Sequence, residues 1–247
     1  HPGRVAPKAF RELWGSDAPE RSPDIPPPQV FTADNYEATY HDPNDDWGRM
    51  GGILRANPDG SGLEIVSHGL RNPWDINFSD SFDWLGADND QSEGDRFFRP
   101  FLGAHLGWNH SWSTDWAGTN NLPTAPAILP LVDGSTTGVV FYDAEGFPEQ
   151  YRGFFVGDWL RKVVYFIRPE WDGARMKMAG GRPMDFVEGG SSLLRTTDLD
   201  IGADGALYVL SWGTTYGSVF DDGEMVNEGR VWRIVWKEND HTVWNMA

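Results

Sequence analysis

The sequence contains no cysteine, which excludes disulfides, thiolate zinc sites, covalently attached haem and cysteine nucleophiles. It also lacks any apolar run near the roughly 20 residues that a membrane-spanning helix needs. Basic residues are scarce, with 20 Lys and Arg against 37 Asp and Glu, and the net charge of −17 argues against nucleic acid as a partner. Serine-hydrolase, phosphate-loop and dinucleotide-binding motifs are absent, so those three kinds of chemistry have no support.

Aromatic residues and turn formers are abundant instead. The 13 Trp, 29 Gly and 17 Pro favour short strands and tight turns over helices. At 247 residues and 39% hydrophobic composition, the chain is typical of a soluble globular protein. Because it starts at His1 rather than at a methionine, we expect it to be processed, trimmed or cut from a longer protein.

The proline content divides the chain into two parts. Residues 1–28 hold seven of the 17 prolines. We therefore predict a Pro-rich irregular arm and entry loop over residues 1–49. From residue 50 to residue 247, short alternating apolar runs are broken by Gly, Asp and Asn, which is the pattern of strands and turns.

Within this second part, a strand–turn–strand pattern occurs three times, over residues 75–88, 138–159 and 198–212. The copies begin 63 and 60 residues apart. Further strand patterns lie at 52–55, 163–166 and 230–235. Short strands repeated in this way, four to a unit, are typical of the blades of a β-propeller. The alternative is an ordinary β-sandwich whose strands resemble one another by chance.

We therefore predict an all-β fold, a β-propeller, with about three to four blades in this chain. A blade usually takes about 40–45 residues, and insertions stretch the units here. A propeller must close to bury its sheet edges. We expect the remaining blades to come from missing sequence or from another chain.

One segment gives the prediction more detail. The sequence GLRNP at 69–73 is surrounded by further short motifs, which are GGILR at 51–55, NPDG at 57–60, DND at 88–90, FRP at 98–100 and GW at 107–108. Over about residues 51–236, the chain resembles the soluble quinoprotein sugar dehydrogenases, a family that includes glucose, aldose-sugar and sorbosone dehydrogenases. It is most similar to the "membrane-bound dehydrogenase"-type propellers of environmental bacteria.

The resemblance implies a fold, a reaction and a cofactor. The whole protein would be a six-bladed propeller that oxidises a sugar or other alcohol by hydride transfer to pyrroloquinoline quinone (PQQ). Electrons would then pass to a separate acceptor such as a cytochrome, because a cysteine-free chain cannot attach a c-type haem. We expect a periplasmic or extracellular location.

The resemblance also implies which residues bind the cofactor. PQQ is a planar tricarboxylate, which guanidinium groups can bind through paired hydrogen bonds and by stacking. Arg71 and Asn72 match the Arg-Asn pair that contacts the cofactor in the family. By blade position, Arg161 and Arg195 fall near further basic contacts. The alternative is that these arginines pair with acidic residues of a very acidic chain.

A calcium ion and a catalytic base complete the implied site. Asp88, Asp90 and Asp95 lie within eight residues directly after a strand, and hard cations bind clustered oxygens. The alternative is a solvated acidic loop. The family uses a histidine upstream of GLRNP to take the proton from the substrate hydroxyl, and His41 is the candidate.

Two other functions remain open from the sequence. The first is a non-catalytic propeller that holds carbohydrate or a protein subunit through Trp108, Trp112 and Trp116. The second is a calcium-dependent hydrolase of the lactonase type.

Overall fold

In the computed structural model, the described residues are 51–62, 64–90, 94–106, 125, 128, 132–188, 194–212, 220–221, 224–225 and 229–239. The predicted arm at 1–49 lies outside them. The described residues are mostly strands, with three short 3-10 helices (η2 Glu149–Tyr151, η3 Ala179–Gly181, η4 Lys237–Asn239). No helix among them is both long and apolar enough to cross a membrane. The chain forms two compact units, residues 1–73 with 100–126 and residues 74–99 with 127–247.

The described part of the first unit is a three-stranded sheet. Its strands are β1 (Gly51–Arg55), β2 (Glu64–Leu70) and β6 (Ala104–His105). β1 and β2 are antiparallel, whereas β2 and β6 run parallel. The predicted turn at 57–60 is present, closed by a 2.8 Å hydrogen bond from the Gly60 N–H to the Asn57 carbonyl.

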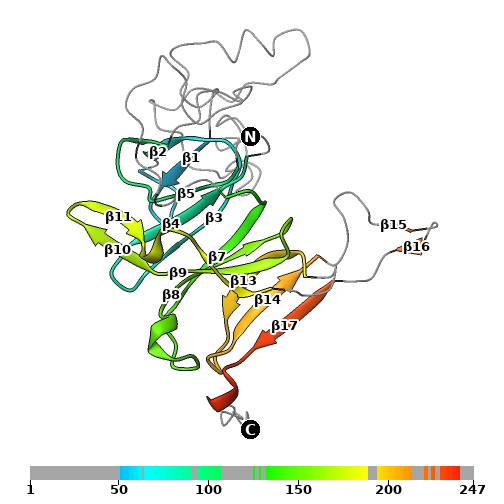
Figure 1. The fold of residues 1–247 in the computed structure, drawn as a ribbon. Coiled ribbons are helices and arrows are strands. Elements are labelled where there is room, and N and C mark those ends of the chain that lie inside the picture. The colour runs from blue at the N-terminus through cyan, green and yellow to red at the C-terminus, as the bar shows by residue number, and fades with distance from the viewer. Residues whose placement is uncertain are drawn as a thin grey trace. The chain divides into compact units, whose positions relative to one another are not determined.

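The second unit contains three larger sheets, which we call blades A, B and C, and two small hairpins. Blade A consists of β3 (Pro73–Phe78), β4 (Trp84–Asp88) and β5 (Arg96–Phe98). Blade B consists of β7 (Thr136–Tyr142), β8 (Gly153–Asp158), β9 (Val163–Ile167) and β12 (Met184–Val187). Blade C consists of β13 (Thr196–Ile201), β14 (Leu207–Ser211) and β17 (Arg230–Ile234). Figure 1 shows blade B in green to yellow and blade C in orange to red.

These blades confirm the three predicted strand pairs. Each pair forms two neighbouring strands of a different sheet. β7 and β13 even share an irregularity, because each contains one extra residue relative to its partner strand, between Thr136 and Val139 and between Thr196 and Asp198. Four strands per blade were predicted; blade B has four, and blades A and C have three among the described residues.

Two small hairpins were not predicted as separate sheets. β10 (Pro169–Asp172) and β11 (Arg175–Met178) form an insertion between β9 and β12 of blade B. β15 (Phe220–Asp221) and β16 (Glu224–Met225) form another, between β14 and β17.

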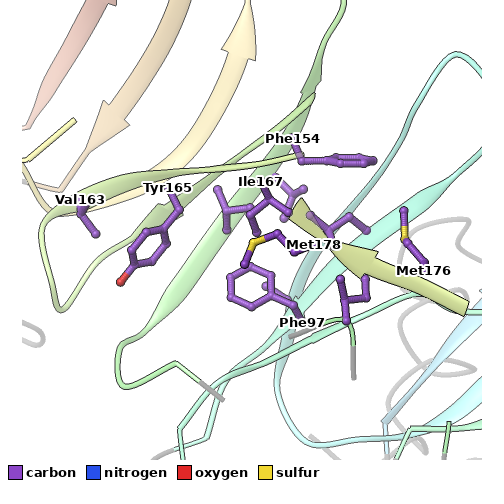
Figure 2. Close-up of a cluster of buried hydrophobic side chains, with 12 residues drawn as sticks. Phe97, Phe154, Val163, Tyr165, Ile167, Met176 and Met178 are labelled. Atoms are coloured by element: carbon purple, nitrogen blue, oxygen red, sulfur yellow. The ribbon is translucent and has the colours of Figure 1, made fainter. Parts of the chain in front are cut away.

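The central strands of blade B are buried on both faces because they are apolar at consecutive positions, as in β9, where all five residues are buried. Side chains on one face join a cluster with blade A, including Phe97, Phe154 and Ile167, which is closed by Met176 and Met178 from β11 (Figure 2). The intervening residues, among them Phe155, join a second cluster with Leu207 and Val209 of blade C, as well as Leu199. The strand period of two thus supplies both neighbours with an apolar face.

The contact between blades B and C is close. Gly157 leaves no space for a side chain, since a Cβ atom there would lie 2.3 Å from Cγ2 of Thr196. The Thr137 hydroxyl donates a 3.0 Å hydrogen bond to the Thr196 carbonyl, and the Tyr142 hydroxyl donates to the Gly205 carbonyl. Polar bonds therefore fix the two sheets in one arrangement.

Candidate functional site

Buried carboxylates gather where the second strands of blades A and B end. Asp88 ends β4 and Asp158 ends β8, and Asp95 lies just before β5. All three are fully buried. A carboxylate buried in this way must have partners, because leaving it unpaired costs several kcal/mol.

Asp95 holds two backbone segments together. Its Oδ1 accepts a 2.9 Å hydrogen bond from the Asp90 N–H, and its Oδ2 accepts one from the Thr136 N–H. Burial raises the pKa of Asp95 to about 6, although these hydrogen bonds oppose the shift. The carboxylate therefore links blade A to the start of β7 in blade B.

Asp158 has a similar role one blade further on. Its Oδ1 accepts hydrogen bonds from the N–H groups of Ser135 (3.1 Å) and Arg161 (2.8 Å), and its Oδ2 accepts one from the Tyr165 hydroxyl (3.3 Å). Burial raises the pKa of Asp158, and burial followed by the Asp158 charge raises the pKa of Tyr165. Asp158 thus fixes the loop that carries Arg161.

The predicted calcium ligands do not form a metal site in the described residues. Asp88 pairs with Arg96 across β4 and β5; burial lowers the Arg96 pKa, and the Asp88 charge opposes that change. Asp95 uses both oxygens on backbone N–H groups, and Asp90 takes part through its own N–H. No three acidic, histidine or cysteine side chains gather as a metal site in the part of the chain that the structure describes. Calcium binding by these residues stays a prediction.

Two of the predicted cofactor arginines lie close to one loop. Arg195 is half-buried, with its guanidinium carbon 4.3 Å above the centre of the Trp159 ring, and Nη1 donates a 3.3 Å hydrogen bond to the Trp159 carbonyl. Arg161 lies two residues after Trp159. Its Nη1 is 3.6 Å from Oδ2 of Asp133, and both side chains are exposed. The structure therefore brings Arg195 to the loop of Arg161.

The other predicted site residues lie outside this unit or outside the described residues. Arg71 and Asn72 are half-buried and belong to the first unit. His41 lies outside the described residues, as do the three tryptophans Trp108, Trp112 and Trp116. Their predicted roles stay predictions.

Trp159 and the role of Asp158 were not predicted from the sequence. A signal for Asp158 was present, because Asp88, Asp158 and Ser211 end equivalent strands of the three repeats. The stacking of Arg195 on Trp159 joins residues 36 positions apart, and no local pattern indicated it.

No protein-family model and no curated protein sequence matches the chain. Solved structures do match. An oxidoreductase from Thermus thermophilus, described as a glucose dehydrogenase, is 18% identical with a TM-score of 0.55, over 74% of this chain and 55% of that one. A second glucose dehydrogenase is 18% identical with a TM-score of 0.57, over 82% and 57%. The PQQ-bound aldose sugar dehydrogenase of Streptomyces coelicolor is 19% identical with a TM-score of 0.51, over 74% and 51%.

These matches show the fold. The chain has an all-β, propeller-type fold shared with glucose and aldose sugar dehydrogenases, which confirms the predicted fold class and, at the level of fold, the predicted resemblance. It spans a little over half the length of these structures, 51% to 57%.

Proposed function

We propose that this chain is part of a PQQ-dependent sugar dehydrogenase and that Arg195, Arg161 and Trp159 contribute to its cofactor site. The stacking of the Arg195 guanidinium on the Trp159 ring carries the proposal, together with the fold. The two predicted arginines come from different blades, yet they meet at one loop. A PQQ-bound protein with the same fold supports the choice of cofactor.

The chemistry of these side chains fits a planar polycarboxylate. Arg195 has five N–H donors, of which the structure assigns one to the Trp159 carbonyl, and its stacking holds the guanidinium plane in place. The Arg161 pair with Asp133 is exposed on both sides, and exposed ion pairs contribute only about 0–1 kcal/mol. A ligand carboxylate can therefore replace Asp133 at little cost.

Each residue would have a separate task. Arg195 would hold a carboxylate of the cofactor through directional hydrogen bonds, and Arg161 would add a second positive charge. Asp158 would keep the 159–161 loop in place through its bond from the Arg161 N–H. When bound, PQQ supplies the two-electron acceptor for the hydride of a sugar or other alcohol. Arg71 and Asn72 from the first unit, the base His41, a separate electron acceptor and a periplasmic or extracellular location remain part of this proposal.

The test is quinone uptake, measured as PQQ absorbance that stays with the protein after desalting, with and without calcium. We expect Arg195→Ala to weaken PQQ binding by about 10- to 100-fold, as for loss of a charged hydrogen bond, and Arg195→Lys to weaken it less. Arg152→Ala is the matched control, because it removes the same charge from an exposed pair with Asp80 and should bind PQQ as the wild type does.

Two results would contradict the proposal. If the wild-type protein retains no PQQ, the dehydrogenase assignment is wrong. If it retains PQQ and Arg195→Ala binds equally well, the cofactor is right and the site lies elsewhere. Dye reduction with a panel of aldoses and alcohols then tests the reaction itself.

A further inference from the structure

The β10–β11 hairpin, an insertion in blade B, carries an exposed tryptophan (Figure 1). Trp171 of β10 lies opposite Met176 of β11. Met176 and Met178 are buried in the cluster between blades A and B, so the hairpin is anchored to the core. Trp171 nevertheless stays 45% exposed, although its ring is large enough to contribute strongly to a core.

Side chains of blade A hold the Trp171 ring in place. The indole N–H donates a 3.3 Å hydrogen bond to Oδ2 of Asp83, and the guanidinium carbon of Arg99 lies 4.9 Å from the ring centre. Asp83 directly precedes β4 and Arg99 directly follows β5, so all three residues belong to the second unit. The exposed part of the ring therefore has a fixed orientation.

Arg99 has donors that the described structure does not use. It is the middle residue of the FRP motif at 98–100, which has no part in the proposed cofactor site. Of its five N–H donors, none makes a hydrogen bond among the described residues: Nε is buried without a partner, and Nη2 is 3.9 Å from Oδ1 of Asp83, too far for one. The side chain is 32% exposed, so its outer N–H groups can reach a ligand.

The turn that carries Asp83 is strained and closely bonded. Phe82 has a φ of 60°, in the left-handed region that bulky side chains rarely adopt, and it is 76% exposed. The Ser79 hydroxyl accepts hydrogen bonds from the N–H groups of Ser81 (3.1 Å) and Asp83 (3.0 Å). These bonds keep Asp83 beside Trp171 and leave a second aromatic ring in solvent. Backbone strain of this kind occurs preferentially at functional sites.

The charges beside the ring restrict the kind of ligand. Arg99 repels a cation and Asp83 repels an anion, so together they favour a neutral ligand. A carboxylate accepts hydrogen bonds from hydroxyl groups, and a guanidinium donates to them. The face of an indole is negative and attracts the weakly positive hydrogens of C–H bonds. A sugar ring combines a C–H face with hydroxyl groups at its rim and meets all three requirements.

A protein partner fits this surface less well. A specific protein interface buries about 800 Å² on each partner and has an apolar centre. The other face of the hairpin is charged, with Glu170 opposite Lys177 and Asp172 opposite Arg175. The apolar surface at Trp171 therefore does not continue across the hairpin.

We propose that Trp171, Asp83 and Arg99 form a binding site for the sugar rings of a neutral polysaccharide. One sugar ring stacks on the exposed part of the indole, donates hydrogen bonds to Asp83 and accepts them from Arg99. Phe82 adds an apolar contact for a neighbouring ring of the same polysaccharide. The site lies at the opposite end of β4 from Asp88, and the proposal does not depend on whether PQQ binds.

Affinity electrophoresis tests the site, because a chain with a net charge of −17 migrates readily in a native gel. The 247-residue protein is run in gels that contain hydroxyethylcellulose, arabinoxylan, glucomannan or amylopectin, with a polymer-free gel as reference. We expect at least one polymer to retard the wild type. Trp171→Ala should raise the dissociation constant for that polymer at least tenfold. Trp171→Phe keeps a ring without the N–H bond to Asp83 and should raise it less.

Trp232→Ala is the matched control. Trp232 is 37% exposed and its indole N–H is also bonded, at 2.9 Å to the Ser211 hydroxyl, but it belongs to blade C. Its loss should leave the retardation unchanged. Melting curves check that each variant is folded. Arg99→Met removes the donors but keeps an apolar chain against the ring; it should weaken binding severalfold and replaces Trp171→Ala if that variant does not fold.

Three results would overturn the proposal. The first is a wild type that none of the four polymers retards. The second is equal retardation of the wild type and of the folded variants at Trp171 and Arg99. The third is a wild type that self-associates in sedimentation without sugar while Trp171→Ala does not, because the ring then contacts a second protein molecule.

Discussion

Asp158 and Asp198 lie on neighbouring blades, but their carboxylates have opposite surroundings. Asp158 is fully buried and accepts three hydrogen bonds, from Ser135, Arg161 and Tyr165. Asp198 is exposed and, within the described part of the chain, accepts one bond, from the N–H of its own neighbour Leu199. Both occur in similar strand repeats, so the difference shows that an acidic residue holds a propeller together where donors from other loops and strands reach its carboxylate.

The largest expected effect comes from Asp158. Asp158→Ala leaves the donors of Ser135, Arg161 and Tyr165 without their acceptor, so we expect a loss of about 3 kcal/mol or more in the free energy of unfolding. Asp158→Asn keeps one acceptor oxygen and should lose less. Urea denaturation measures both variants. A loss below about 1 kcal/mol for Asp158→Ala would show that water replaces the carboxylate and that the comparison fails.

The second effect is a dependence of stability on pH. The pKa of folded Asp95 is raised to about 6, above its unfolded value, so the folded protein takes up a proton first as the pH falls. Stability should therefore rise as the pH is lowered from about 7 towards about 4 and be smallest above about pH 6. A shift of this size corresponds to about 3 kcal/mol at most.

Urea denaturation at constant ionic strength checks this dependence, with Asp95→Asn as the reference. Lowering the pH also reduces the net negative charge of the whole chain, which stabilises wild type and variant alike. The contribution of Asp95 is thus the difference between wild type and variant in the slope of unfolding free energy against pH. Identical slopes would mean that the Asp95 carboxylate does not titrate in this range.

The smallest expected effect is the difference in stability loss between variants of Asp75 and Asp198, which occupy matched positions of the repeat. Asp75→Ala removes the acceptor of the Val139 N–H and of the Ile76 N–H, and should cost about 1–2 kcal/mol. Asp198→Ala removes only the local bond on an exposed face, and should cost less than about 0.5 kcal/mol in the 247-residue chain. Equal losses in the two variants would contradict the claim that Asp75, unlike Asp198, is stabilised by a hydrogen bond from the next blade.

The strand pairs could be predicted because their information is local. Apolar strand patterns recur within each repeat, the third repeat has a tight turn around Gly205, and the structure has strands in those places. The β10–β11 insertion escaped prediction because Arg175–Met178 alternates too briefly to distinguish a hairpin from an outer strand.

The site was harder to predict because its bonds join distant residues. The acidic run that includes Asp88, Asp90 and Asp95 has the composition of a calcium loop. Metal ions and backbone N–H groups both seek carboxylate oxygens, so composition cannot separate the two. In the structure, one oxygen of Asp95 accepts a hydrogen bond from the N–H of Thr136, 41 residues away, and no local pattern indicates this partner. For Arg195, the stacking on Trp159 likewise depends on the packing of blades B and C.

The carboxylates of β13 also affect how the edge of blade C behaves. β13 lies at one edge of its sheet, and edge strands invite pairing with other molecules. Here the N–H groups of Leu199 and Ile201 are already bonded to Asp198 and Asp200. A strand from a second molecule would meet two negative charges instead of open donors. The two carboxylates therefore protect this edge of the sheet from edge-to-edge aggregation.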